Sequence, residues 1–228
     1  MSERVSSIFA EVSESYDMVN SISSLGVIIL WRMSAANEAM IEKDKYALLD
    51  IATGTGDLSF EIAKKANRLQ KDISITGMDF SPNMLKVAKK KEESRKTGIK
   101  FEHGDAMKLK YKDNSFDVVT SSFALRNVDD LNKFAGEAKR VLKKGGKFVF
   151  MDMARPSSSI ERLFLNSYWS AVSWIGFIES KNAFDWLVES VNRFDKEAFV
   201  KILKKTGFKN IKMRNLFPGS SFIVTGNK

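Results

Sequence analysis

The sequence predicts an α/β protein built on a doubly wound, mostly parallel sheet. Apolar runs alternate with amphipathic stretches from about residue 47 to 153, as expected when each strand is followed by a crossover helix. A Gly-x-Gly turn at residues 54–56 follows the first apolar run, which is typical of a buried strand, a tight loop and a helix. Two further short runs, about 208–217 and 221–226, predict a closing antiparallel hairpin. Together these segments give an expected seven-stranded sheet.

Length and composition bound the class of protein. At 228 residues and 25.7 kDa, the chain forms one large domain, or one domain with an inserted lid. Hydrophobic residues make up 43%, and no apolar run reaches the roughly 18 residues that span a bilayer. The N-terminal Met1-Ser2-Glu3-Arg4 lacks an apolar signal core, so we expect a cytoplasmic protein. With no cysteine and one histidine, we expect no disulfide and no metal site of the usual kinds.

The charge of +9, with a pI near 9.5, leaves three explanations open. Much of the excess comes from lysine runs at residues 86–91 and 204–205, which lie on expected helices. Solvated helix faces are the interpretation that we favour. Affinity for an anionic membrane face comes second, and nucleic acid comes third.

The chain before the first strand predicts an N-terminal helical cap. Residues 1–46 are loosely amphipathic, with Val5, Ile8, Phe9 and Val12 at helical spacing. Residues 25–32 are apolar and aromatic but too short to cross a membrane, so they could cover a ligand or lie on a surface. Residues 47–228 then form the main domain.

The remaining strands and helices of the sheet follow in order. We expect the second to fifth strands at about residues 73–80, 99–105, 116–123 and 146–153. Ser81-Pro82 is a typical helix start, with serine as the N-cap and proline in the first turn. Asp129 or Asp130 caps a second helix, and Lys143-Lys144-Gly145-Gly146 is expected to end it.

After the fifth strand, the pattern changes from alternation to helices. Residues 157–194 are dense in aromatic side chains and predict a helical lid inserted into the domain. Ordinary core packing of the same aromatic residues is the alternative. A further helix is expected from Asp195 to Thr206, ended by Gly207.

Acidic residues follow the ends of successive predicted strands. Asp50 and Asp57 flank the glycine turn, Asp79 ends the second strand, and Asp105 follows the third. Because the carboxyl ends of parallel strands meet in one crevice, we expect these side chains to lie together. Asp79 follows Gly56 by 23 residues, an offset at which a carboxylate accepts hydrogen bonds from a ribose. Asp105 and the Ala106 backbone are then placed for an adenine edge.

The glycine turn favours a cofactor without a diphosphate. A dinucleotide fingerprint needs a third glycine at position 59, where the chain has Ser59. The Asp57 carboxylate would repel a diphosphate, whereas a zwitterionic sulfonium has no phosphate. The stretch from Leu48 to Asp57 resembles motif I of the S-adenosylmethionine (SAM) methyltransferases. The fold expected from this resemblance is the Rossmann-like methyltransferase sheet.

The loop after the fourth strand carries the candidate catalytic residues. Arg126 keeps its charge and can fix an oxyanion or an ordered water, and Asn127 can both donate and accept hydrogen bonds. The alternative is that Arg126 only ties down its loop through backbone carbonyls. No Pro-Pro-aromatic segment follows, which argues against methylation of exocyclic amines of nucleic-acid bases. For the lone His103, we expect a structural role.

Several segments in order resemble the ubiquinone/menaquinone biosynthesis C-methyltransferase family over nearly the whole chain. The more specific segments are Ser15-Tyr16-Asp17-Met18-Val19-Asn20 and Ser122-Phe123-Ala124-Leu125-Arg126-Asn127; the others are Leu30-Trp31-Arg32, Asp113-Asn114-Ser115-Phe116-Asp117 and Leu142-Lys143-Lys144-Gly145-Gly146. The chain departs from the family pattern at Phe184-Asp185-Trp186-Leu187 and at Asp152-Met153-Ala154-Arg155-Pro156, both near the expected acceptor site.

The resemblance implies site residues. It places cofactor contacts at Thr55, Asp79, Asp105, Ala106 and Ser122, to which we add the neighbouring Asp50, Thr53, Gly54, Gly56 and Phe80. It places substrate-side, catalytic roles at Tyr16, Arg126 and Asn127.

The expected function is SAM-dependent methyl transfer to a ring carbon of a prenylated quinol. The alternatives are methylation of another small molecule or lipid, methylation of RNA, and SAM binding without catalysis. The expected partners are the quinol and the surface of a membrane, with the protein peripheral at its inner face. We expect no nucleic acid, and leave a homo-oligomer open.

Overall fold

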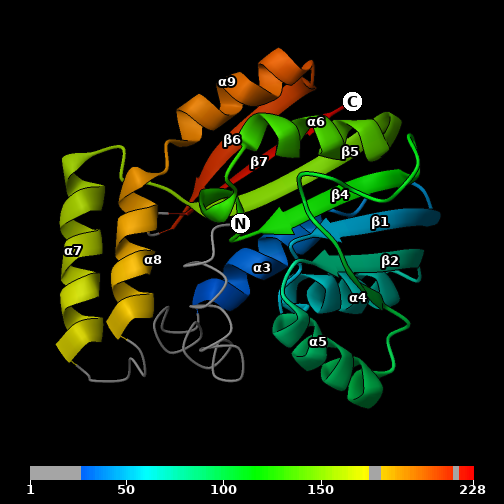
Figure 1. The fold of residues 1–228 in the computed structure, drawn as a ribbon, viewed down its shortest axis with the longest axis horizontal. Coiled ribbons are helices and arrows are strands. Elements are labelled where there is room, and N and C mark those ends of the chain that lie inside the picture. Colours follow the sequence, from blue (N-terminus) through cyan, green and yellow to red (C-terminus); the bar gives the residue numbers. More distant parts are fainter. Residues whose placement is uncertain (1–26, 175–180, 218–220) are drawn as a thin grey trace.

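The computed structural model describes residues 27–174, 181–217 and 221–228, and its centre is a seven-stranded sheet in the order β3-β2-β1-β4-β5-β7-β6 (Figure 1). The strands are β1 (Lys45–Ile51), β2 (Asp72–Asp79), β3 (Lys100–His103), β4 (Phe116–Ser122), β5 (Leu142–Met153), β6 (Lys209–Leu216) and β7 (Ser221–Asn227). The first five strands pair in parallel, β7 runs antiparallel to β5, and β6 runs antiparallel to β7. The predicted doubly wound sheet with a closing antiparallel pair is confirmed.

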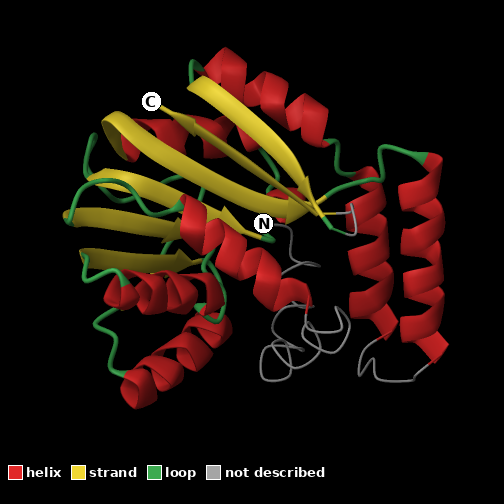
Figure 2. Ribbon diagram, turned by 180° about the vertical axis from the view of Figure 1, so that it is seen from behind, coloured by secondary structure: helices red, strands yellow, loops and turns green. Residues whose placement is uncertain are grey.

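Helices cover both faces of the sheet, as Figures 1 and 2 show from opposite sides. Their bounds are α3 (Val27–Glu38), α4 (Asp57–Arg68), α5 (Pro82–Arg95), the 3-10 helix η1 (Leu125–Asn127), α6 (Leu131–Val141), α7 (Ser159–Trp174), α8 (Lys181–Arg193) and α9 (Lys196–Thr206). One core packs α3, α4 and α5 against the sheet, and a second packs α6 and α9 against the other face. The α7–α8 pair lies beyond the carboxyl ends of the parallel strands.

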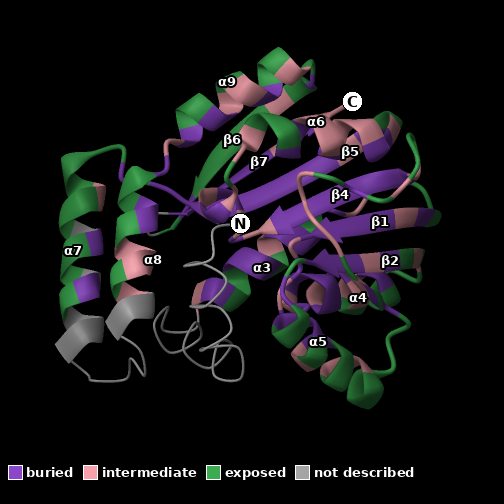
Figure 3. Cartoon of the chain, in the orientation of Figure 1, coloured by how far each residue is buried: buried purple, intermediate pink, exposed green. Residues whose placement is uncertain are grey.

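The central strands are buried on both faces (Figure 3). Leu48 of β1 and Val118 of β4 belong to the core under α3 and α4, whereas their neighbours Leu49 and Val119 belong to the core under α6 and α9. Because side chains alternate between the faces of a strand, both sets must be apolar. This is why the sequence shows continuous apolar runs here instead of strict alternation.

The predicted starts of α5 and α6 and the predicted end of α9 are confirmed, and Asp195, the first residue of the predicted last helix, is its N-cap. The Ser81 side chain accepts from Met84 N at 3.4 Å, and Pro82 is the first residue of α5. Asp130, rather than Asp129, caps α6. Asp195 accepts from Ala198 N at 2.9 Å, and Gly207 ends α9 in the left-handed region with φ +88°.

The start of β5 differs from the prediction. We expected residues 143–146 to end a helix and the strand to begin at Gly146, but α6 ends at Val141 and β5 begins at Leu142. Leu142 is fully buried and pairs with Phe116 of β4, so the strand has already joined the sheet at this point. The pairing of β5 with β4 is irregular between Leu142 and Lys147, and Gly145, with φ +74°, lies within this stretch.

An ion-pair cluster closes the amino-terminal end of the sheet. The Asp117 carboxylate contacts Lys43 Nζ at 2.6 Å and Lys143 Nζ at 2.7 Å, and it accepts from Ala47 N at 3.1 Å. Burial alone would raise the pKa of Asp117, but these cations and the N–H group outweigh burial and lower the pKa to about 2. Asp117 therefore joins the loop before β1 to the start of β5.

The predicted lid corresponds to α7 and α8, within residues 159–174 and 181–193. Trp169 of α7 packs edge-on against Phe184 of α8, with ring centroids 5.6 Å apart. Of the predicted N-terminal cap, residues 1–46, the structure describes α3, the loop after it and the first two residues of β1, and residues 1–26 lie outside the described part. The division into a cap, a main domain and a lid stays a prediction. Among the described residues, no helix is long and apolar enough to cross a membrane.

Candidate active site

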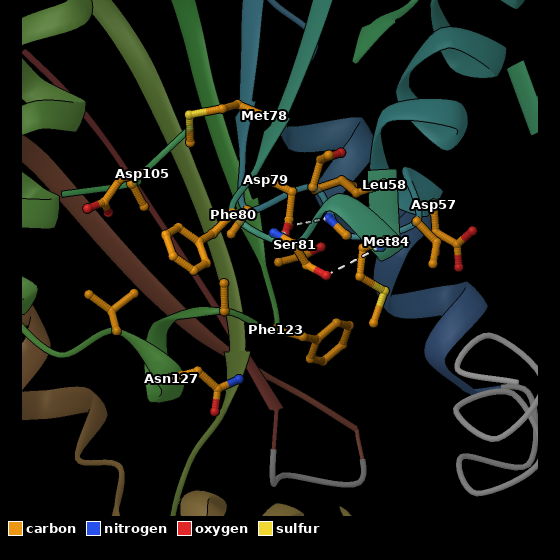
Figure 4. Close-up of a pocket in the computed structure, with 18 of the residues that line it drawn as sticks. Asp57, Leu58, Met78, Asp79, Phe80, Ser81, Met84, Asp105, Phe123 and Asn127 are labelled. Carbon is orange, nitrogen blue, oxygen red and sulfur yellow. Dashed lines mark hydrogen bonds between the residues drawn. The ribbon is translucent and has the colours of Figure 1, made fainter. Parts of the chain in front are cut away.

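A pocket opens at the carboxyl ends of β1, β2 and β4, between the loops that follow them (Figure 4). The structure brings nine of the predicted site residues together in its lining: Thr53, Gly54, Thr55, Asp79, Phe80, Asp105, Ala106, Ser122 and Asn127. In Figure 4, the Phe80 ring lies between Asp79 and Asp105, and Phe123 and Asn127 lie across the pocket from them. The predicted residues Asp50, Gly56 and Arg126 are not in the lining, and Tyr16 lies outside the described residues.

The loop after β1 owes its shape to left-handed backbone conformations. Ala52, Gly54 and Gly56 have φ values of 55°, 58° and 84°. A side chain at Gly56 would also clash, because an added Cβ would lie 2.7 Å from the ring of Phe101. The absence of a side chain at Gly56 thus lets the start of α4 pack closely against Phe101 of β3, and this packing supports the loop on the side away from the pocket.

Asp50 lies beneath the loop and fixes it. Its carboxylate accepts from the hydroxyls of Thr53, Ser59 and Thr120, each at 2.7 Å. Burial raises the pKa of Asp50, and the three hydroxyl donors oppose that effect. The side chain therefore links β1, the loop, α4 and β4 without facing the pocket.

Asp79, at the end of β2, connects the two loops that border the pocket. Its Oδ2 accepts from Gly54 N at 2.7 Å, and its Oδ1 accepts from Ser81 N at 2.8 Å. Burial raises the pKa of Asp79, and these two backbone donors oppose it. A carboxylate has about four lone-pair positions, so acceptor capacity remains toward the pocket. Asp105 likewise accepts from a backbone N–H, that of Met107, with its Oδ1 at 2.8 Å, and it also keeps acceptor capacity.

Two cations compensate the Asp57 carboxylate. Arg32 of α3 lies 2.6 Å from one carboxylate oxygen, and Lys91 of α5 lies 2.7 Å from the other. The sequence argument that a free Asp57 charge would repel a diphosphate therefore does not hold. The acidic character of the pocket rests on Asp79 and Asp105 instead.

The chain leaves β4 through an unusual backbone conformation. Phe123 has φ 56°, a left-handed value that is rare for a bulky residue. Its N–H donates to Met151 O at 2.8 Å, and its ring packs on Trp31 with centroids 6.3 Å apart. This turn directs η1, with Arg126 and Asn127, toward the pocket side of the sheet.

Arg126 forms an ion pair with Asp152 of β5. The Arg126 side chain is 7% exposed and the Asp152 side chain is fully buried. Asp152 also accepts from the Arg126 and Met153 backbone N–H groups. Burial raises the pKa of Asp152, and the facing guanidinium opposes the rise. Arg126 is thus anchored by a carboxylate, whereas the alternative considered from the sequence was anchoring by backbone carbonyls.

Several residues that lie in or next to the site had no site role assigned to them from the sequence. Asp152 is the only charged residue among residues 148–153, and such an interruption of a buried strand could have indicated it. Arg32 and Met84 carry no comparable signal, because each reaches the pocket only through the packing of α3 or α5. His103 makes a contact with the Phe80 carbonyl, 3.0 Å from Nε2, in line with the structural role expected for it. Among the described residues, no group of three or more potential ligands could hold a metal ion.

The pocket suits a cationic nucleoside cofactor. Of its described lining residues, Asp57, Asp79 and Asp105 are acidic and Arg32, which is paired, is basic. Met78, Phe80 and Met84 supply apolar surface. An acidic pocket with apolar walls fits the ribose, adenine and sulfonium of SAM, and the lining that the structure describes offers no unpaired cation to a diphosphate. With the parallel sheet and its antiparallel β6–β7 pair, this site defines a SAM-dependent methyltransferase.

Comparison with known proteins gives the family. The model of the ubiE/COQ5 methyltransferase family matches residues 1–228, and the chain belongs to that family. It is 36% identical to the demethylmenaquinone methyltransferase of Deinococcus radiodurans, over 99% of this chain and 93% of that protein. It is also 36% identical to the ubiquinone/menaquinone biosynthesis C-methyltransferase UbiE of Rickettsia bellii, over 94% of this chain and 88% of that protein.

Solved structures agree on the fold. A SAM-dependent methyltransferase of Thermotoga maritima, described as a possible histamine N-methyltransferase, superposes with a TM-score of 0.67 at 22% identity, covering 97% of this chain and 98% of that chain. A putative SAM-dependent methyltransferase of Methanococcus maripaludis gives a TM-score of 0.66 at 20% identity, covering 94% and 91%. At these identities, the likeness bears on the fold alone.

Proposed function

We propose that the chain transfers the methyl group of SAM to a ring carbon of a prenylated quinol in menaquinone or ubiquinone biosynthesis. The observation that carries the proposal is the position of Asn127, which lines the cofactor pocket from the same short helix that holds Arg126. Membership of the ubiE/COQ5 family and the names of the relatives at 36% identity support the quinol as acceptor.

The residues that end or follow β1 to β4 would hold the cofactor. Asp79 would accept from the ribose hydroxyls, Asp105 and Ala106 would border the adenine, and Thr53, Gly54, Thr55, Phe80 and Ser122 would complete the contact surface. Bound SAM supplies an electrophilic methyl group on a sulfonium. The structural role of Asp50 and Gly56 is to keep the loop in the required shape.

The acceptor has to be activated on the η1 side of the pocket. A phenolate is a much stronger carbon nucleophile than a phenol, so the site must favour loss of the quinol hydroxyl proton. Arg126 and Asn127 stabilise the resulting oxyanion or hold the water that takes the proton, and Tyr16 is a third substrate-side group. A carbon–carbon bond forms as the carbon–sulfur bond breaks, and the ring carbon releases its own proton to water. Positioning of the two reactants contributes much of the rate.

The direct test uses single-turnover transfer from labelled SAM. The reduced quinol should be labelled, and the oxidised quinone should not be, because the oxidised ring has no hydroxyl to ionise. Equal labelling of both would exclude the phenolate mechanism. Mass spectrometry of quinones from cells that lack and then regain the chain would identify the ring.

The quinol tail implies contact with a membrane surface. The prenyl chain keeps the acceptor in the bilayer, and the charge of +9 favours reversible association with anionic lipid, with the protein peripheral to the membrane. Vesicle co-sedimentation should show binding at low salt that weakens at high salt. Absence of binding at low salt would mean that the quinol is delivered in another way. Light scattering under the same conditions measures the mass of the protein in solution and so tests for a homo-oligomer.

A further inference from the structure

The side-chain amide of Asn127 has a defined orientation. Asn127 is 9% exposed, and its Oδ1 lies 3.2 Å from the indole Nε1 of Trp186 in α8. An indole N–H can only donate, so the amide atom that faces it must be the oxygen. The amide nitrogen therefore points away from α8, and Figure 4 shows it on the side nearer to Phe123. Nδ2 makes no hydrogen bond with the described part of the chain.

The indole is itself held in place. The Arg193 guanidinium lies over the Trp186 ring, with its carbon 5.2 Å from the ring centroid. Trp186 is half-buried between Arg193 and η1, within the segment where the sequence departs from the family pattern. The donor that orients Asn127 thus comes from the α7–α8 pair and not from the sheet that carries the rest of the site.

Arg126 and Asn127 differ in how many of their hydrogen-bond donors are already used within the protein. The guanidinium of Arg126 is paired with the buried Asp152, so part of its charge is already compensated. Asn127 Nδ2, by contrast, has two N–H groups that no described residue uses. Its oxygen already accepts from Trp186 on the α8 side, whereas both N–H groups of Nδ2 lie on the other side of the amide (Figure 4).

We propose that Trp186 is a positioning residue that fixes Asn127 as a hydrogen-bond donor to the acceptor oxygen. The inference rests on the proposed function, and it selects between the two roles left open there. Asn127 stabilises the developing phenolate through Nδ2 and does not hold the deprotonating water through Oδ1. The α7–α8 pair then controls activity through one indole N–H, in addition to covering the acceptor.

The first test measures the contact without any reaction. The Trp186 indole N–H signal in nuclear magnetic resonance is assigned by its loss in Trp186→Phe. Asn127→Leu, which has no acceptor, should move this signal, and Asn127→Asp, which keeps an oxygen, should restore the hydrogen-bonded shift. If the chemical shift of the Trp186 indole N–H is unchanged by both substitutions, the proposed orientation is wrong.

The second test separates positioning from simple packing. Trp186→Phe keeps an aromatic ring under Arg193 and removes the indole N–H donor. We expect kcat to fall by about 2- to 12-fold, the scale of one neutral hydrogen bond, with the KM for SAM unchanged. The apparent pKa of the kcat profile for a short-tailed quinol should rise, because the phenolate loses an oriented donor. Unchanged kcat and unchanged pH dependence, with the fold intact, would contradict the role.

Asn127→Asp distinguishes the two roles of Asn127. A carboxylate could still hold a deprotonating water, but it cannot donate to a phenolate at neutral pH. We expect a kcat loss of roughly 10²-fold, whereas retained activity would favour the water-holding role and overturn the proposal. If the wild-type chain methylates no quinol while the indole signal responds to Asn127, the proposed function fails, and with it the role of Nδ2; the contact itself is then only structural.

Discussion

The Arg126 guanidinium is paired with the fully buried carboxylate of Asp152, from the neighbouring strand β5. The pair joins η1 to the sheet at the border of the cofactor pocket. Because both charges are removed from water, each depends on the other for compensation. The same arginine is therefore both a candidate for stabilising the acceptor and a structural anchor of its own loop.

Arg126→Ala should lower turnover by roughly 10²–10⁴-fold, the usual scale for one electrostatic or acid–base group. SAM affinity should barely change, since the proposed cofactor contacts come from other loops. Arg126→Lys should recover little, because a point charge does not reproduce a planar guanidinium. Arg126→Ala also leaves the buried Asp152 carboxylate without its counter-charge, so thermal unfolding has to accompany the single-turnover rates and the calorimetry. Wild-type rates in Arg126→Ala would reduce Arg126 to a brace of the loop.

Asp152→Asn should destabilise the fold by about 3–5 kcal/mol, because it leaves the Arg126 guanidinium buried without a counter-charge. Chemical unfolding of the single variant measures the effect. The matched control is the double variant Arg126→Gln/Asp152→Asn, in which no unpaired charge remains and much of the stability should return. If the single variant is as stable as wild type, the ion pair does not carry the energy that its burial implies.

Asp79→Ala should weaken SAM binding at least about tenfold. The substitution removes a charged acceptor, and hydrogen bonds to charged groups contribute about 1.5–3 kcal/mol each. Asp79 also holds Gly54 N and Ser81 N, so thermal unfolding has to accompany the calorimetry. Unchanged affinity in a folded variant would remove Asp79 from the cofactor site.

The Asp117 cluster should make the fold sensitive to acid. The pKa of Asp117 in the folded chain is about 2, below the ordinary value of 3.8. The unfolded chain therefore binds this proton more tightly, and the stabilisation present above about pH 4 is lost as the pH falls toward 2. We expect a contribution of about 1–2 kcal/mol, reduced by salt because Lys43 and Lys143 are partly exposed. Asp117→Asn should flatten this part of the curve of unfolding free energy against pH.

Most of the sheet and the loops that border the pocket could be predicted, because apolar runs, the glycine turn and helix-cap residues each lie within a short stretch of the sequence. Asp79 and Asp105 could be placed together from the sequence, since parallel strands bring their carboxyl ends to one edge. The Arg126–Asp152 pair and the Asn127–Trp186 hydrogen bond could not, because each joins segments whose approach depends on how strands and helices pack. The charge of Asp57 was misjudged for the same reason, as its partners Arg32 and Lys91 come from two other helices.

Ala52 and Phe123 hold left-handed backbone conformations on two sides of the pocket, although neither is a glycine. Such a conformation costs a non-glycine residue about 1–2 kcal/mol. A laboratory selection for heat resistance should therefore collect Ala52→Gly. It should not collect Phe123→Gly, because Phe123 is buried, its ring packs on Trp31, and deleting a buried aromatic ring costs about 3–5 kcal/mol, which exceeds the strain relieved. At position 123, the packing of the ring thus outweighs the strain of the backbone, and a laboratory lineage should keep the strained turn.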